Sequence, residues 1–253
     1  MARPKTSKTL EQRLMEARAE STFHDPKLKY FPIESTRRLV TSKAIEKEFK
    51  KFEIELSRLK EAEEEEDNDE GDDNYDDEED EEEGSLDKAD DDQESSKAFY
   101  LKFAGYDQEK LEKLAQWVDK NAHTTFAIAV ASGFSPLNLL PYMATFEAGG
   151  FTDRDLERMD DLEKLKFRGD PASLERFCEQ RWRFLAPVFS TEQYDYDLPS
   201  DCLFPFQKDD SKSRKGAFGL VSKVLVHEEH QRHPGIQSVC VNAHVSTKKA
   251  EDL

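Results

Sequence analysis

The chain has 253 residues, of which 36% are hydrophobic and 37% are charged, and its formal net charge is −19. This balance is typical of a partly disordered protein and excludes a chain that is packed along its whole length. The three cysteines Cys178, Cys202 and Cys240 lie far apart and indicate neither a disulfide framework nor a zinc site.

The first segment, residues 1–35, is predicted to be a polar N-terminal arm. A short helix around Leu10, Leu14 and Met15 fits its pattern, and Asp25-Pro26 predicts a turn after it.

An amphipathic helix is predicted within residues 36–60. Thr41 or Ser42 can cap its first turn by accepting from free backbone N–H groups. Apolar residues then follow one helix face, namely Ile45, Phe49, Phe52, Leu56 and Leu59. This apolar seam fits a helix that docks on its own domain, or else a short two-stranded coiled coil.

Residues 61–96 are predicted to be a disordered acidic run. Residues 61–94 contain 23 Asp or Glu and one Lys, and they hold almost no apolar side chain that could be buried. Like charges repel, and the missing burial leaves the ordering entropy uncompensated. The run is either a solvated spacer or a surface that binds a basic protein partner such as a histone.

Residues 97–182 are predicted to form a packed helical region that could also bind a protein partner. One helix ends near Asn121 and carries an apolar face that consists of Leu111, Leu114, Ala115 and Val118. The next segment, Phe126–Ala131, fits a helix, although its residues also fit a strand. Asp170-Pro171 predicts the start of another helix, because proline is tolerated in a first turn.

The remaining chain is predicted to be extended. Residues 183–202 contain a proline in an apolar stretch and read as a linker, and residues 203–253 read as short strands. The fold class predicted for the whole chain is therefore mainly α, with a small C-terminal antiparallel β hairpin or three-stranded piece and a long disordered acidic segment.

Two apolar features bear on the compartment. The N-terminus lacks the apolar core of a signal peptide. The most apolar stretch, from Phe126 to Phe146, is interrupted by Gly133, Pro136 and Pro141, whereas a membrane span needs about 20 mostly apolar residues. We therefore expect an intracellular protein, cytoplasmic or nuclear, that contacts neither a membrane nor nucleic acid directly.

A glycine-containing motif lies between two of the predicted strands. It reads Gly216-Ala217-Phe218-Gly219-Leu220-Val221. Glycines let a backbone approach phosphate groups, because no Cβ stands in the way.

The motif resembles the glycine-rich loop of protein kinases, and its context resembles a group of fungal serine/threonine protein-kinase-like proteins. Trp182–Phe189 is similar to their W-x-F-x-A-P-x-F segment, and Val224–Gln231 to the V-x-I-H-x-x-H-Q segment after the loop. The close resemblance covers residues 180–253, and a looser one covers 25–60 and 97–180. It implies a partial kinase N-lobe in 203–253 and family activity in ATP-dependent phosphorylation of protein serine or threonine.

The resemblance also implies a nucleotide site. In the family, the loop glycines and the aromatic tip cover the ATP phosphates, and the valine packs on the adenine. The residues that match these positions are Gly216, Ala217, Phe218, Gly219 and Val221. The first glycine position of the motif holds Arg214 instead.

The departures from the family are large. Val239-Cys240-Val241-Asn242 is the best match to the third strand, and Asn242 stands where the family has a lysine that binds phosphates. The catalytic-loop H-R-D and the magnesium-binding D-F-G are missing from the sequence. We therefore expect a chain truncated within the N-lobe, catalytically inactive, with weak ATP contact at most and magnesium only in a complete family member. The alternative is a non-enzymatic interaction protein that uses the helical region and the acidic run.

A second constellation follows the glycine motif. His227, Glu228, Glu229, His230 and His233 invite a metal-site interpretation. His227 and His230 lack the four-residue separation of the helical H-E-x-x-H site, so we expect no physiological metal there. The resemblance places these residues in the turn after the second strand.

Overall fold

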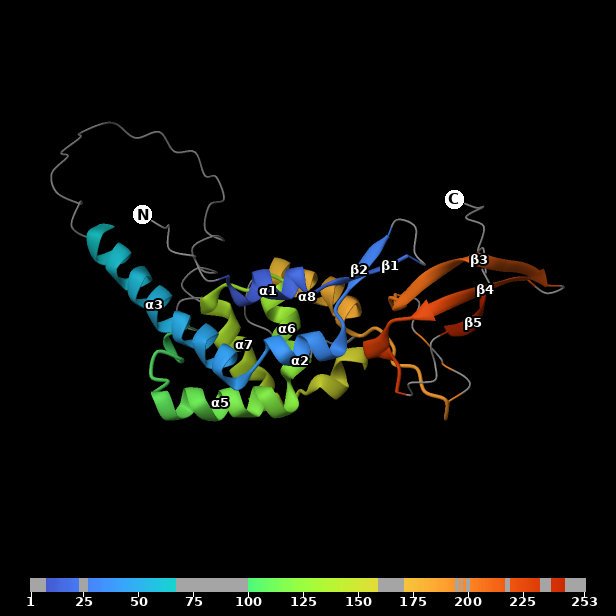
Figure 1. The fold of residues 1–253 in the computed structure, drawn as a ribbon. Helices are drawn as coiled ribbons and strands as arrows, with labels where there is room; N and C mark the ends of the chain where they lie inside the picture. The colour runs from blue at the N-terminus through green and yellow to red at the C-terminus, as the bar shows by residue number, and fades with distance from the viewer. Residues whose placement is uncertain are drawn as a thin grey trace, which may run out of the picture. The chain divides into compact units, whose positions relative to one another are not determined.

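A computed structural model describes residues 8–22, 27–66, 100–158, 171–193, 196, 198, 201–216, 219–232 and 238–243. Most of the predicted acidic run, residues 67–96, lies outside these ranges, as does the predicted turn at Asp25-Pro26. The first part of that run was predicted wrongly, because residues 61–66 are helical and continue the preceding helix. The described part is mainly helical with small antiparallel sheets, which confirms the predicted fold class (Figure 1). No helix within it is long and apolar enough to cross a membrane.

The chain divides into two compact units. One combines Met1–Arg38 with Gln180–Leu253, and the other comprises Leu39–Glu179. We call them the sheet unit and the helical unit. The sheet unit is therefore assembled from two segments that are more than a hundred residues apart in the sequence.

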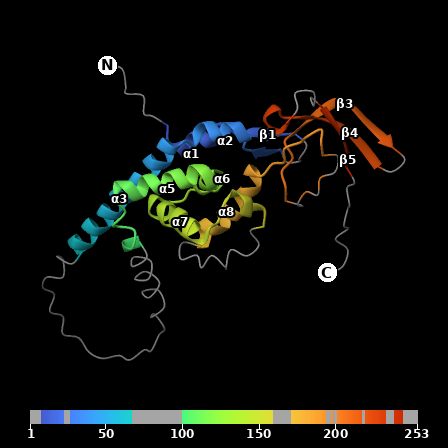
Figure 2. The ribbon, with the colours of Figure 1, turned by 90° about the horizontal axis from the view of Figure 1, so that it is seen from below.

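The helical unit is organised around the long helix α3 (Ser42–Glu66), which packs against α5 (Gln108–Asn121) and α7 (Pro136–Gly149) (Figure 2). Thr41 caps α3, and its hydroxyl accepts from the Ala44 N–H at 3.3 Å. The first four seam residues, Ile45, Phe49, Phe52 and Leu56, are buried, whereas Leu59 is 45% exposed. The seam is thus used within the chain, as the docking interpretation predicts.

The predicted face of α5 is confirmed, because its four apolar residues are all buried. The ambiguous segment after it is the helix α6 (His123–Ala131), in which residues 125–131 are all buried. A helix surrounded by protein has apolar residues on every side, so it lacks the 3.6-residue period that distinguishes helix from strand. The Asp153 carboxylate caps the first turn of α6, where it accepts hydrogen bonds from the N–H groups of Thr124 and Thr125, both at 2.8 Å.

Pro141 does not break its helix. Ser135 caps α7 and Pro136 occupies the first turn, but Pro141 lies inside the helix. Gly150 ends α7 with a left-handed φ of 68°. The described helix α8 (Pro171–Phe184) begins at the predicted proline and crosses from the helical unit into the sheet unit.

The sheet unit contains a three-stranded antiparallel sheet of β3 (Phe206–Gly216), β4 (Gly219–Val226) and β5 (Ser238–Ala243), with β4 in the centre. The short 3-10 helix η2 (Glu228–His230) follows β4. A core cluster of Phe189, Phe206, Val224 and Val226 packs at the base of β3 and β4.

The predicted N-terminal arm is instead part of the sheet unit. It forms α1 (Leu10–Glu16), the hairpin strands β1 (Ala19–Ser21) and β2 (Leu28–Tyr30), and the start of α2 (Ile33–Leu39). The capping box at Thr9 starts α1, and Leu10 and Leu14 are buried. Phe31 stacks on Phe184 with ring centroids 3.8 Å apart. The prediction missed this packing because most residues of the segment are polar. Its few buried apolar residues contact residues that are distant in the sequence.

The predicted linker is also packed. Ala186 and Phe189 are buried, and Phe189 forms a parallel bridge with Gln231. The Phe189 N–H donates to the His230 carbonyl at 2.8 Å, and the Arg232 N–H donates to the Phe189 carbonyl at 2.9 Å. The segment is extended, as its proline predicts, but its backbone groups pair with the residues after β4.

Candidate functional site

The glycine motif lies where β3 ends and β4 begins. Gly216 pairs with Gly219, so Ala217 and Phe218 are the two residues between the strands, and both lie outside the described residues. The next pairs down the ladder are Lys215 with Leu220 and Arg214 with Val221. The structure therefore brings Gly216, Gly219 and Val221 to the same end of the sheet.

Asn242 lies on the strand next to β4. Asn242 of β5 pairs with Val221 of β4 in antiparallel register. Directly opposed residues of antiparallel strands have Cα atoms about 4.5 to 5.5 Å apart. The backbone therefore sets Asn242 beside the glycine motif, on the strand edge next to its valine.

A second group of polar residues surrounds η2, the 3-10 helix after β4. His227 caps it, and its Nδ1 accepts from the Glu229 N–H at 3.3 Å. Residues 227–230 of the histidine and acid run thus lie directly after β4, the second strand of the sheet. Among the described residues no group of three or more candidate metal ligands comes together, and His233 is outside them.

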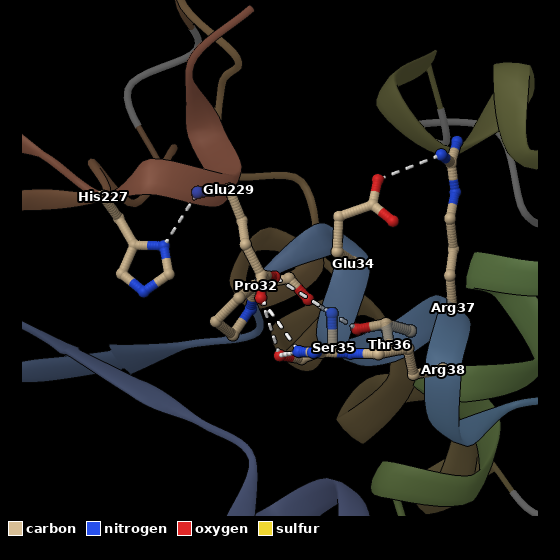
Figure 3. Close-up of polar contacts among 8 residues, drawn as sticks. All are labelled: Pro32, Glu34, Ser35, Thr36, Arg37, Arg38, His227 and Glu229. Carbon is tan, nitrogen blue, oxygen red and sulfur yellow. Dashed lines mark hydrogen bonds and ion pairs between the residues drawn. The ribbon is translucent and has the colours of Figure 1, made fainter. Parts of the chain in front are cut away.

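Glu229 joins η2 to α2 of the N-terminal segment (Figure 3). Its Oε2 accepts from the Ser35 N–H at 2.9 Å, and its Oε1 accepts from the Ser35 hydroxyl and from the Arg38 guanidinium, both at 3.1 Å. The Arg38 guanidinium also donates to the Ser35 hydroxyl at 2.8 Å. We call Ser35, Arg38 and Glu229 the Glu229 clamp.

The exposure of the Glu229 clamp is uneven. The Glu229 side chain is 15% exposed, whereas Arg38 is 70% exposed. A carboxylate that is mostly out of water needs donors, and here the backbone and hydroxyl of Ser35 supply two of them in the first turn of α2. The arginine adds a charge at the solvent side.

His230 lies in an aromatic cluster with Tyr30 and His227. Its ring centroid is 5.3 Å from that of Tyr30 and 6.0 Å from that of His227, in edge-on geometry. The side chain is fully buried. Its Nδ1 lies 3.1 Å from the Pro187 carbonyl, which can only accept, so Nδ1 carries the proton. We call Tyr30, His227 and His230 the His230 cluster.

Burial controls the protonation of the His230 cluster. The pKa of His230 is lowered to about 4, mainly by burial and in smaller part by the nearby charge of His227, against the opposing effect of the hydrogen bond to Pro187. Burial first, and the charge of Glu229 second, raise the pKa of the Tyr30 phenol above its usual range. The His230 Nε2 and the Tyr30 hydroxyl have no hydrogen-bond partner among the described residues. At neutral pH both side chains are uncharged.

Sequence reasoning placed the glycine motif and the histidines but missed the Glu229 clamp. Glu229 and Ser35 are separated by 194 residues, and neither lies in a pattern that indicates a partner. No protein-family model, curated protein or solved structure matches the chain.

Proposed function

We propose that residues 206–243 are a kinase-like N-lobe sheet whose glycine hairpin makes weak contact with ATP, and that this chain does not itself transfer a phosphoryl group. The observation that carries the proposal is the strand register: Gly216 pairs with Gly219 at the hairpin, and Asn242 pairs with Val221. This order of strands, turn and motif is the one that the resemblance to serine/threonine protein kinases implies.

Weak contact follows from the residue types. A glycine hairpin allows close approach of its backbone N–H groups to phosphate oxygens. A neutral amide at 242 supplies no permanent positive charge, whereas a lysine at that position holds the α- and β-phosphates in the family. Phosphoryl transfer depends on positioning and on metal-borne charge, so a contact of this kind binds without catalysing.

The proposal is tested by titrating Mg-ATP into the full chain. We expect saturable binding with a Kd on the order of 1 mM, equivalent to about −4 kcal/mol. Gly219→Val should abolish it, because the added side chain blocks the backbone approach. Gly105→Val is the matched control, since a Cβ at Gly105 in the helical unit meets no atom within 4 Å. Asn242→Lys should tighten binding by restoring the charge.

Binding that is absent up to about 10 mM, or that survives Gly219→Val unchanged, would contradict a nucleotide role for the hairpin. Phosphorylation of a protein substrate by the purified chain would contradict the second half of the proposal.

A second candidate function is a non-enzymatic interaction protein that uses the helical region and the acidic run. It is favoured by two large apolar side chains exposed on α3, Ile54 at 54% and Leu59 at 45%, shortly before the acidic run begins. Salt-sensitive binding to purified histones that disappears when residues 61–94 are deleted would support a basic partner. Binding that survives the deletion would rule out the acidic run as the contact.

A further inference from the structure

We propose that Ser35 is a phosphorylation site for a protein serine/threonine kinase, and that a phosphate on its hydroxyl opens the Glu229 clamp. The inference goes beyond the proposed nucleotide contact and does not depend on it.

Ser35 is the hydroxyl around which the Glu229 clamp is built. Its Oγ donates to Glu229 at 3.1 Å and accepts from Arg38 at 2.8 Å, so it lies between a negative and a positive charge (Figure 3). The side chain is half-buried, and the neighbouring Arg37 and Arg38 are 66% and 70% exposed. Thr36 is buried and its hydroxyl donates to the Pro32 carbonyl, so Ser35 is the reachable hydroxyl of the pair.

The helix that carries Ser35 is short enough to open for a modifying enzyme. α2 has seven residues, and a helix of this length is not stable on its own in water. Its stability therefore comes from contacts such as the Glu229 clamp. Local opening exposes the segment Glu34–Arg38, in which arginines stand two and three residues after the serine.

The reaction is an ordinary phosphoryl transfer from ATP supplied by the modifying kinase. The Ser35 Oγ forms a bond to the γ-phosphorus, the bond from that phosphorus to the bridging oxygen of ADP breaks, and the hydroxyl proton passes to the base of the kinase. The product carries about −1.5 to −2 charges at pH 7.

The phosphate would replace attraction within the Glu229 clamp by repulsion. The Ser35 hydroxyl can no longer donate to Glu229, and the new charge lies within hydrogen-bond reach of a carboxylate that is 15% exposed. Arg38 already touches the Ser35 Oγ and can turn to the phosphate, which forms stronger paired hydrogen bonds with guanidinium. Glu229 thereby loses donors while it gains a repulsive neighbour, so η2 should separate from α2.

Separation of η2 from α2 should also weaken the backbone hydrogen bonds that η2 and the residues next to it make. The amides of Phe189, His230 and Arg232 donate to carbonyls of this region, at 2.8, 2.9 and 2.9 Å. These three amides therefore report on the opening.

The first experiment asks whether the site is modified. The full chain is incubated with Mg-ATP and a purified protein kinase that prefers serines beside arginines, and its phosphopeptides are mapped by mass spectrometry. We expect phosphate on Ser35. A chain phosphorylated elsewhere or nowhere overturns the assignment.

The second experiment asks what the phosphate does, independently of the choice of kinase. Phosphoserine is installed at position 35 of the full chain, and amide hydrogen exchange is compared with the unmodified chain. We expect exchange at Phe189, His230 and Arg232 to accelerate at least about fivefold, because local opening free energies set exchange rates.

Two matched controls separate this effect from a general one. Ser57 is exposed on α3 and its hydroxyl donates to the Glu53 carbonyl of the same helix, so phosphoserine at this position should leave the three amides unchanged. In Glu229→Gln the repulsive charge is gone, so phosphoserine at 35 should accelerate exchange far less. Equal exchange with and without the phosphate at 35 overturns the switch.

Discussion

At the residue scale, two neighbouring residues of η2 differ in charge and in environment. Glu229 is charged and is satisfied by donors from Ser35 and Arg38. His230 is neutral, fully buried and held by the Pro187 carbonyl. The H-E-E-H run invited a metal-site interpretation, which its spacing argued against, and residue types alone do not show which side chains point inward. The structure accounts for both residues by contacts within the protein.

Protonation of His230 should destabilise the fold at mildly acidic pH. Its folded pKa is about 4, below the ordinary value of about 6.5 that it has when unfolded. The stabilisation that neutral His230 provides is therefore fully present above pH 6.5. As the pH falls from 6.5 to 4, the free energy of unfolding decreases by about 3 kcal/mol in total.

The measurement is urea unfolding of the full chain at several pH values. His230→Gln should show a shallower fall in the free energy of unfolding over this range, because the variant side chain does not titrate. His123→Gln, in the helical unit, removes another histidine and serves as the comparison. A His230→Gln profile parallel to the wild type would show that His230 is not the titrating group.

Removal of the Glu229 carboxylate should cost more than removal of an exposed one. Glu229→Ala leaves the Ser35 N–H without its acceptor and should lower the free energy of unfolding by about 1–3 kcal/mol. Glu34→Ala removes the pair with Arg37, in which both side chains are more than half exposed, and should cost less than about 0.5 kcal/mol. Chemical denaturation measures the free energy of unfolding of both variants. Equal decreases would mean that the Glu229 clamp stabilises the fold no more than an exposed ion pair does.

At the scale of the element, prediction succeeded where one face of a helix or one turn decides the structure. The apolar seam of α3 and the cap at Thr41 are local features, and both could be predicted from the sequence. The hairpin at Gly216 and Gly219 was readable for the same reason, because glycines mark a turn between alternating residues. α6 was ambiguous because its burial on every side removes the period.

The buried and exposed faces of α3 predict opposite results for two apolar substitutions. Phe49 is fully buried and packs edge-on against Phe126 with centroids 5.7 Å apart. Phe49→Ala should therefore cost about 3–5 kcal/mol, since it removes buried surface and leaves a cavity. Ile54 is 54% exposed, so Ile54→Ala should change stability by less than about 0.5 kcal/mol.

Thermal unfolding distinguishes the two variants. A large loss in Ile54→Ala would indicate that this side chain is covered by a partner or a second copy in solution. A negligible loss in Phe49→Ala would contradict the intramolecular seam and revive the coiled-coil alternative.

At the scale of the whole molecule, the two compact units do not follow the boundaries that the sequence suggested. The prediction separated an N-terminal arm and a linker that the structure puts into one unit with the C-terminal strands. Tyr30 joins the cluster of Ala186 and Leu203, and the Ser21 hydroxyl donates to the Phe206 carbonyl at 3.2 Å. Contacts across such distances depend on the path of the whole chain, which no local period encodes.

We propose that ATP contacts this chain at the glycine hairpin of the sheet unit. The most direct measurement is amide hydrogen exchange of the full chain with and without Mg-ATP at about 10 mM. We predict slower exchange in residues 214–221 and 240–243, no change in residues 111–118 of α5, and loss of the effect in Gly219→Val. Exchange that is unchanged in the hairpin, or protection confined to the helical unit, would contradict the claim.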